Sequence, residues 1–252
     1  MKVLITGNRG FIGTHLANIE HGAHGCDWKD GAEVTRLTDD VEYTHIFHCA
    51  SSKSVPLGEV EYKQFIENNC VMATHLSKTF PNARIVNLSS SSVNEIKSVY
   101  GMTKAFAEMQ GIQHKNWVNV RLYNVFGEGQ YYESGAVVPR FISAFLRGEA
   151  PEVYGSGDQR RDLTYVGDVV RGLHDIMFGS DKTGVIHLGY GEPISILGLI
   201  EAIWGEFPKV KYMPKREVDI IDSCSPEKMT TVIYGREEGL KRTIEWMRHE
   251  KA

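Results

Sequence analysis

The chain begins Met1-Lys2-Val3-Leu4-Ile5-Thr6-Gly7-Asn8-Arg9-Gly10-Phe11-Ile12-Gly13, and this stretch decides the fold. The apolar run predicts a buried parallel strand. The glycines after it are spaced Gly-x-x-Gly-x-x-Gly, one residue longer than the usual dinucleotide fingerprint. They permit a tight turn, a close approach of the backbone to a pyrophosphate, and close packing of the next helix on the strand. The stretch therefore predicts a dinucleotide-binding turn, with a helix N-terminus facing the phosphates.

The rest of the chain alternates strand-like and helix-like patterns, which predicts an α/β fold with a Rossmann-like, doubly wound parallel sheet and a smaller C-terminal substrate-binding region. The predicted strands are 2–6, 23–27, 44–50, 84–88, 117–122 and 185–188. The predicted helices are 11–21, 59–79, 98–114, 137–147, 166–178, 195–204 and 235–249. We expect a dinucleotide-binding domain at 1–125, to which 163–188 returns, and a substrate-binding region formed by 126–162 and 189–252.

Composition argues against several classes of partner and site. The chain has 252 residues, of which 42% are hydrophobic, and a net charge of −4 without a basic tract, so nucleic acid is not an expected partner. The four cysteines lack metal-type spacing, and we expect no metal site. No apolar run reaches membrane length. The first predicted strand starts at residue 2, so we expect no signal peptide and a cytoplasmic protein.

Tyr100 and Lys104 stand one helical turn apart and would project from the same helix face. A nearby ammonium favours the phenolate and would lower the pKa of the tyrosine from about 10 toward neutrality. The tyrosine could then serve as a general acid or base. The alternative interpretation is an exposed helix face, since this spacing also arises by chance. The glycine turn upstream favours the catalytic interpretation.

Together these motifs resemble the extended short-chain dehydrogenase/reductase family, and within it the NAD-dependent sugar-nucleotide epimerase/dehydratase group. The resemblance covers nearly the whole chain. Besides the glycine turn and the Tyr100–Lys104 pair, the matching segments are 45–50, 68–74, 84–90, 120–127 and 153–168.

The resemblance implies NAD as cofactor. The implied contacts are Gly7, Asn8, Arg9, Gly10, Phe11, Ile12, Asp27, Cys49, Ala50, Ser51, Asn69, Tyr100 and Lys104. Asp27 ends the second predicted strand, where a carboxylate can accept both ribose hydroxyls and repel a 2′-phosphate, which favours NAD over NADP. The alternative for Asp27 is a solvated loop residue.

The resemblance also implies a catalytic set of Ser90, Tyr100 and Lys104. If the strand register is shifted by one, Ser91 takes the place of Ser90; otherwise Ser91 is expected at the substrate. Arg161 and Arg216 match arginines that contact a substrate diphosphate, which two guanidinium groups can clamp with bidentate hydrogen bonds. Asn124 matches a position that touches the diphosphate or the sugar.

The chain departs from the family in two trimmed segments. Residues 28–43 replace a helix and a strand and leave the adenine contacts open, and the loop between Ser90 and Tyr100 is short. No acidic pair follows the serines where dehydratases and decarboxylases of this group carry extra acids; Asn94-Glu95 is nearest and comes late.

We therefore expect an NAD-dependent sugar-nucleotide 4-epimerase that uses transient hydride transfer through a 4-keto intermediate. A keto-sugar-nucleotide reductase or dehydratase of the same fold is one alternative, and a non-catalytic dinucleotide-binding or sensor protein is another. The family also implies a homodimer through the helices at 59–79 and 98–114.

Overall fold

The computed structural model describes residues 1–53, 55–215 and 222–250, with the backbone alone described at 55 and 56. The chain divides into two compact units. Unit 1 comprises Met1–Leu122 and Val170–His187, and unit 2 comprises Tyr123–Val169 and Leu188–Ala252. The chain therefore returns to unit 1 at Val170, inside a helix. The sequence pattern placed this return at residue 163.

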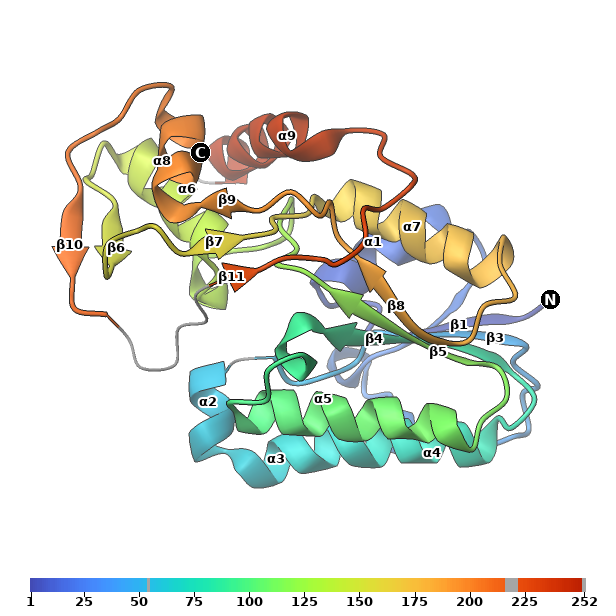
Figure 1. The fold of residues 1–252 in the computed structure, drawn as a ribbon. Helices are drawn as coiled ribbons and strands as arrows, with labels where there is room; N and C mark the ends of the chain where they lie inside the picture. The colour runs from blue at the N-terminus through green and yellow to red at the C-terminus, as the bar shows by residue number, and fades with distance from the viewer. Residues whose placement is uncertain (54, 216–221, 251–252) are drawn as a thin grey trace. The chain divides into compact units, whose positions relative to one another are not determined.

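Unit 1 is built on a six-stranded sheet with the order β2-β1-β3-β4-β5-β8 (Figure 1). Neighbouring strands from β2 to β5 pair in parallel, as in Thr6 with His48 across β1 and β3. The strands are β1 Val3–Thr6, β2 His24–Cys26, β3 His45–His48, β4 Arg84–Ser90, β5 Trp117–Leu122 and β8 Gly184–Leu188. The Rossmann-like parallel sheet expected from the sequence is confirmed.

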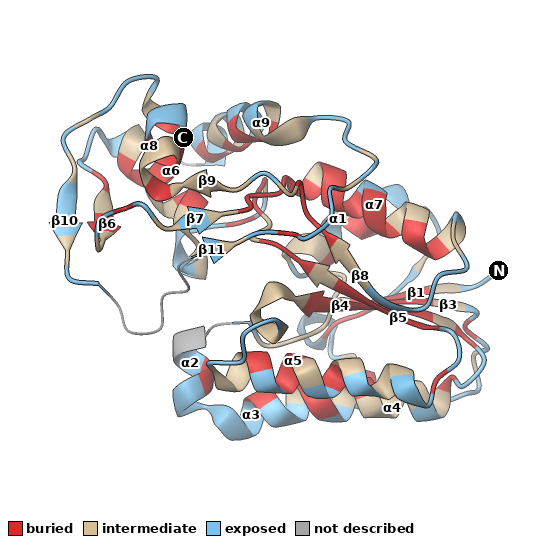
Figure 2. Ribbon diagram, in the orientation of Figure 1, coloured by how far each residue is buried: buried red, intermediate tan, exposed pale blue. Residues whose placement is uncertain are grey.

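Helices cover both faces of this sheet (Figure 1). Helices α3, α4 and α5 lie on one face, and α1 and α7 lie on the other. Their bounds are α1 Phe11–Ile19, α2 Val55–Val60, α3 Tyr62–Ile66, α4 Met72–Thr79, α5 Val99–Met109 and α7 Val166–Phe178. The core lies between helices and sheet, where Leu4, Ile46, Leu76, Ile85 and Trp117 are at most 1% exposed. Figure 2 shows the buried β4 and β5 within this layer.

The structure differs from one sequence expectation here, and it describes a segment for which the sequence predicted neither a helix nor a strand. The single helix expected at 59–79 is interrupted by a π-helical turn, Glu67–Val71, between α3 and α4. The trimmed segment 28–43 forms two short 3₁₀ turns, Trp28–Asp30 and Val34–Arg36. Val34 is 4% exposed and packs into the core, so the segment covers apolar surface without adding a strand.

The described residues of unit 2 form the α-helices α6, α8 and α9 and two small sheets. Strands β6 and β10 pair in parallel, and β7 lies between β11 and β9. The bounds are α6 Val137–Arg147, β6 Glu152–Tyr154, β7 Arg160–Arg161, β9 Ile194–Ser195, α8 Ile196–Trp204, β10 Lys211–Met213, β11 Asp222–Ser223 and α9 Gly235–Glu250.

A buried carboxylate, Asp168, organises unit 2. One oxygen accepts hydrogen bonds from the backbone N–H groups of Ile233 and Tyr234, at 2.7 and 3.0 Å. The other accepts from the N–H of Gly235 at 2.9 Å and from the hydroxyl of Tyr190 at 2.5 Å. The negative charge therefore satisfies N–H groups at the start of α9, where the helix dipole also favours an anion.

A second buried carboxylate, Asp162, acts in the same way on the neighbouring loops. It accepts hydrogen bonds from the backbone N–H groups of Tyr190, Gly191 and Ser225. Both aspartates belong to the segment 153–168, which the sequence analysis matched to the family. Their contacts here are structural, because each carboxylate ties together backbone groups of unit 2.

We predict that Asp168→Asn destabilises the protein by about 2–4 kcal/mol, because an amide NH₂ would face backbone donors that the carboxylate now satisfies. Urea denaturation measures this change. Asp158→Asn is the matched control, since Asp158 lies in the same unit and is exposed. Equal stability of the two variants would contradict the role given to Asp168.

Candidate functional site

The turn after β1 requires glycine at two positions. Gly7 has φ +68°, and a Cβ there would lie 2.7 Å from the backbone nitrogen of Ala50. A Cβ on Gly13 would lie 2.0 Å from the carbonyl oxygen of Gly7. Gly10 stands at the N-cap of α1 and contributes no side-chain cap. The first N–H groups of α1, from Phe11 and Ile12, are therefore available to an anion.

Asp27 follows β2 and is 6% exposed. Its carboxylate accepts hydrogen bonds from the backbone N–H groups of Arg9, at 3.1 Å, and Lys29, at 3.0 Å. A carboxylate offers about four lone-pair positions, so acceptor capacity remains for ribose hydroxyls. The guanidinium of Arg9 is paired with Asp30. The buried Oδ1 of Asn8, in the same turn, has no hydrogen-bond partner among the described residues.

The end of β3 lies against this turn. The Thr6 hydroxyl and Nδ1 of His48 are 2.8 Å apart, and the N–H of Ala50 donates to the same hydroxyl at 3.3 Å. Burial lowers the pKa of His48 to about 3, so the ring is neutral. Cys49 and Ser51 are partly exposed, and burial raises the pKa of the Cys49 thiol to about 12. The thiol is therefore no nucleophile at neutral pH.

Asn69, in the π-helical turn, forms hydrogen bonds with the loop after β3 and with α5. Its Oδ1 accepts from the N–H of Ser52 at 2.8 Å, and its amide donates to the carbonyl oxygen of Ser52 and to the hydroxyl of Thr103. Both amide hydrogens are thus used. Asn69 connects the loop after β3 with α5, and its expected contact with the cofactor remains a prediction.

The loop after β4 approaches α5 closely. Ser98 caps α5 by accepting a hydrogen bond from the N–H of Gly101 at 3.1 Å. A Cβ on Gly101 would lie 2.9 Å from the carbonyl oxygen of Ser92, so glycine permits this approach. Ser90 ends β4, and its hydroxyl oxygen lies 3.2 Å from both the N–H and the hydroxyl of Ser92.

The expected catalytic groups meet at this point. The side chain of Ser90 forms a hydrogen bond with Tyr100. Ser91 belongs to the 3₁₀ turn Ser91–Val93 that follows the strand. The contact with Tyr100 favours Ser90 over Ser91 as the serine of the catalytic set.

Lys104 lies one turn further along α5 and is 5% exposed. Its ammonium donates to the carbonyl oxygen of Leu88 at 2.7 Å. Burial lowers the pKa of Lys104 to about 8, and the nearby Cys49 and Glu108 act in the opposite direction. Its charge is therefore sensitive to small changes around neutral pH.

The expected pKa shift of Tyr100 is wrong in direction. Burial raises the pKa of Tyr100 above its ordinary value, and the hydrogen bond from Ser90 is the influence that lowers it. The cost of burying a phenolate outweighs the local Tyr-x-x-x-Lys spacing, because desolvation disfavours the charged form. Tyr100 is therefore a neutral phenol at neutral pH.

The residues expected at the substrate belong to unit 2. Asn124 has φ +37°, and its amide donates to the Ser223 hydroxyl at 3.2 Å. Arg161 lies in β7, with Nη1 2.8 Å from the carbonyl oxygen of Arg160. Arg216 lies outside the described residues.

Comparisons with known proteins identify the family. A model described as the NAD dependent epimerase/dehydratase family matches residues 3–189. The chain belongs to this family. Its members are NAD-dependent, so the protein is an NAD-dependent enzyme.

Similar proteins lie within the same group. The chain is 26% identical to UDP-glucuronic acid decarboxylase 1 of Danio rerio, over 99% of this chain and 73% of the relative. A structure of UDP-N-acetylglucosamine 4-epimerase from Methanobrevibacter ruminantium, in complex with UDP-N-acetylmuramic acid, matches with a TM-score of 0.86 and 25% identity, over 99% of this chain and 98% of that one. MoeE5 in complex with UDP-glucose and NAD matches with a TM-score of 0.85 and 27% identity, over the full length of both chains.

The described residues fit the NAD that the epimerase/dehydratase family uses. The Gly7 turn and the start of α1 would hold its phosphates, and Asp27 would hold a ribose. Asn8, with its unpartnered buried oxygen, lies in the same turn. The described residues contain no group of His, Cys, Asp and Glu that could hold a metal ion. None of the described helices has the length and apolar character needed to cross a membrane.

Several contributing residues were missed by the sequence analysis. Thr6 and His48 brace the glycine turn, and Glu108 influences the charge of Lys104. The ammonium of Lys53 lies 5.8 Å from the centre of the Phe11 ring, which adds positive charge near the start of α1. Only Glu108 could have been found from spacing, because it follows Lys104 by one turn of the same helix. The roles of Thr6, His48 and Lys53 depend on contacts between separate elements.

We predict that Gly7→Ala lowers NAD affinity roughly tenfold or more, because the new Cβ must displace the backbone of Ala50 or the turn itself. Isothermal titration calorimetry measures the affinity. Gly22→Ala is the matched control: it has φ +86° but no atom within 4 Å of the added Cβ. It should cost about 1 kcal/mol of stability and leave NAD binding unchanged. Unchanged NAD affinity in Gly7→Ala would show that the turn does not hold the cofactor.

Proposed function

We propose that the protein is a sugar-nucleotide 4-epimerase that works by transient hydride transfer through a 4-keto sugar. The observation that carries this proposal is the hydrogen bond between Ser90 and Tyr100, with the ammonium of Lys104 buried one turn further along α5. A hydroxyl relay beside a cation can take a proton from a sugar alcohol and later return it. Bound NAD supplies the acceptor and donor of the hydride.

We infer a role for each of the three side chains, and their positions support it. Tyr100 exchanges the proton with the sugar hydroxyl. Ser90 orients that hydroxyl and stabilises charge on its oxygen as the proton leaves. Lys104 in its protonated form stabilises the tyrosinate that forms transiently, which a buried phenol needs because its pKa is raised.

Two observations weigh on the alternatives. Elimination of water by a dehydratase needs a further acid or base beside the reacting sugar. The turn after Ser90 carries only serines and a valine, and Glu95 beyond it is exposed and paired with Lys97. These features favour the epimerase over a dehydratase. The similarity to a UDP-glucuronic acid decarboxylase keeps decarboxylation as the second candidate.

For the substrate we propose a sugar nucleotide whose diphosphate is contacted by Arg161 and Arg216, with Asn124 nearby. The support is the motif match and the complexes of two similar proteins, which hold UDP-N-acetylmuramic acid and UDP-glucose. Charge-assisted bonds from guanidinium groups suit a diphosphate.

We predict that the protein interconverts a UDP-hexose and its 4-epimer with catalytic amounts of NAD. The assay incubates UDP-glucose, UDP-N-acetylglucosamine or UDP-glucuronic acid with the protein and identifies products by NMR. Tyr100→Phe should lower kcat by about 10²-fold or more, because it removes the proton carrier and keeps the ring. Ser90→Ala should be less severe, and NAD binding should persist in both.

Tyr212→Phe is the matched control, since it removes a hydroxyl from a ring on β10 that is 57% exposed and has no assigned role. Stoichiometric accumulation of NADH would indicate a net oxidoreductase, and release of CO₂ from UDP-glucuronic acid would indicate the decarboxylase. Full activity in Tyr100→Phe would reject the proposed site. Binding of NAD without turnover of any of these sugars would support the sensor alternative.

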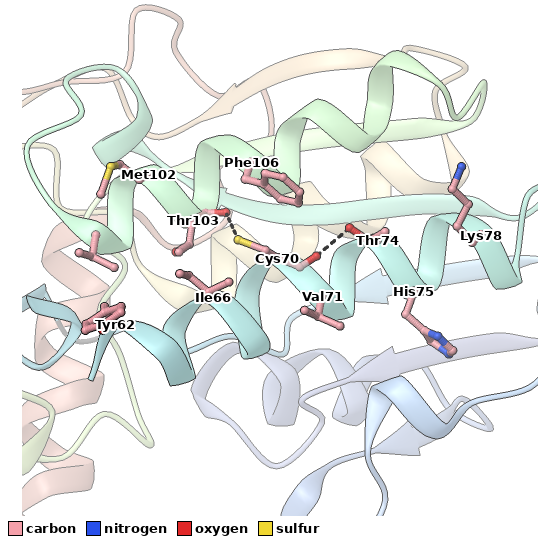
Figure 3. Close-up of a pocket in the computed structure, with 11 residues that line it drawn as sticks. Tyr62, Ile66, Cys70, Val71, Thr74, His75, Lys78, Met102, Thr103 and Phe106 are labelled. Carbon is pink, nitrogen blue, oxygen red and sulfur yellow. Dashed lines mark hydrogen bonds between the residues drawn. The ribbon is translucent and has the colours of Figure 1, made fainter. Parts of the chain in front are cut away.

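We also propose a homodimer through α3, α4 and α5. A groove of about 830 Å³ runs between these elements, lined mainly by apolar side chains that include Tyr62, Ile66, Val71, Met102 and Phe106 (Figure 3). These five side chains are 43–53% exposed. Large apolar side chains gathered on one face are typical of a protein interface. Phe65 of α3, by contrast, is 1% exposed and packs inside unit 1.

We predict that Phe106→Glu converts the dimer to a monomer, because it places a charge in the apolar groove. Light scattering at micromolar concentration measures the mass. Ile112→Glu serves as the control, since Ile112 is 79% exposed and lies outside the groove on the continuation of α5. A wild-type protein of monomeric mass would contradict this proposal.

A further inference from the structure

Glu108 connects the helix of the candidate site to two strands. It lies on α5, one turn after Lys104, and its side chain is 10% exposed. Its Oε1 accepts from the hydroxyl of Ser89 at 2.5 Å and from Nε of Arg121 at 2.8 Å. Its Oε2 accepts from Nη2 of Arg121 at 2.7 Å, which completes a bidentate ion pair.

The same network reaches the loop after β4. Nη1 of Arg121 donates to Oδ1 of Asn94 at 2.7 Å, and Asn94 directly follows the 3₁₀ turn Ser91–Val93. Ser89, the donor to Glu108, immediately precedes Ser90. The Glu108–Arg121 pair therefore binds the chain at two points around Ser90. Glu108 binds Ser89, directly before Ser90, and Arg121 binds Asn94, directly after the 3₁₀ turn.

A second connection fixes the backbone of Glu108. Its carbonyl oxygen accepts from the amide of Asn119 at 3.0 Å, and Oδ1 of Asn119 accepts from Asn87 at 2.8 Å and from the Trp117 indole at 2.7 Å. These side chains are at most 3% exposed. A fully bonded buried network of this kind orients the groups attached to it.

We propose that Glu108 and Arg121 are positioning residues, which hold α5 against β4 so that Tyr100 stays bonded to Ser90 and Lys104 stays charged beside it. This inference rests on the proposed function for the roles of Tyr100 and Lys104. Neither Glu108 nor Arg121 is assigned a contact with the substrate.

The electrostatics agree with the geometry. Glu108 raises the pKa of Lys104, against the larger effect of burial. The other groups facing Lys104 are His48 and Cys49 at the end of β3 and the carbonyl oxygen of Leu88 on β4. Because His48 is neutral and Cys49 is a thiol at neutral pH, Glu108 is the anion of this set. Loss of its charge should let Lys104 lose its proton at lower pH.

The test compares Glu108→Gln with Arg121→Gln. The first removes the negative charge, so Lys104 should titrate below about 8. The second removes the positive charge that compensates Glu108, so Lys104 should titrate at a higher pH than in the wild type. NMR of protein labelled with ¹³C-lysine measures this titration without substrate, so the result stands even if the sugar substrate is wrong.

Activity supplies the second readout. Both variants should lower kcat about 10- to 100-fold, because both loosen the alignment of Tyr100 with Ser90. The KM should change little. The alkaline limb of the activity profile should move down in Glu108→Gln and up in Arg121→Gln, following Lys104. A merely structural pair would change stability without these opposite shifts.

Two further variants guard the result. Ser89→Ala removes one donor to Glu108 without leaving a buried charge unpaired, so it should fold and lower kcat several-fold. Glu238→Gln breaks an exposed Glu–Arg bond of 3.0 Å on α9, and both readouts should stay at their wild-type values. The inference is overturned if Lys104 titrates at the same pH in all folded variants, or if Ser89→Ala retains full kcat.

Discussion

The burial of one ammonium group, that of Lys104, is the constraint on which the rest of the candidate site depends. A buried charge is costly unless it is paired or hydrogen-bonded. The ammonium of Lys104 donates a hydrogen bond to the carbonyl oxygen of Leu88, and the carboxylate of Glu108 favours its charged form. The glycine at position 101 permits the close approach of α5 to the turn after β4. The same approach places Tyr100 against Ser90.

The cofactor side follows from a different constraint, the space available to the backbone. Gly7 and Gly13 stand where a single methyl group would collide with neighbouring main chain. Asp27 already accepts hydrogen bonds from the N–H of Lys29 in its own loop and from the N–H of Arg9 in the glycine turn, so its orientation is set before a ribose arrives. The free N–H groups of α1 and the oriented carboxylate would together hold the dinucleotide.

The motif at 153–168 combines an observed structural role with a proposed contact to substrate. Asp162 and Asp168 hold the loops and the last helix of unit 2 through hydrogen bonds to backbone N–H groups. Arg161, the last residue of β7, directly precedes Asp162 and is proposed to contact the substrate. A motif that resembles a substrate signature thus also stabilises the unit that carries it, and the two roles separate only when the partners of each side chain are known.

Local patterns determined much of this protein. The run from Val3 to Gly13 predicted the first strand, the turn and the first helix. The two signals, an apolar run and a glycine spacing, both lie in adjacent residues. The Tyr100–Lys104 spacing likewise placed both side chains on one helix. Tertiary structure alone decided the raised pKa of Tyr100, which follows from burial, and the partners of Glu108. Ser89 and Arg121 lie 19 and 13 positions from Glu108, and only the packing of α5 on β4 and β5 brings them within hydrogen-bond distance.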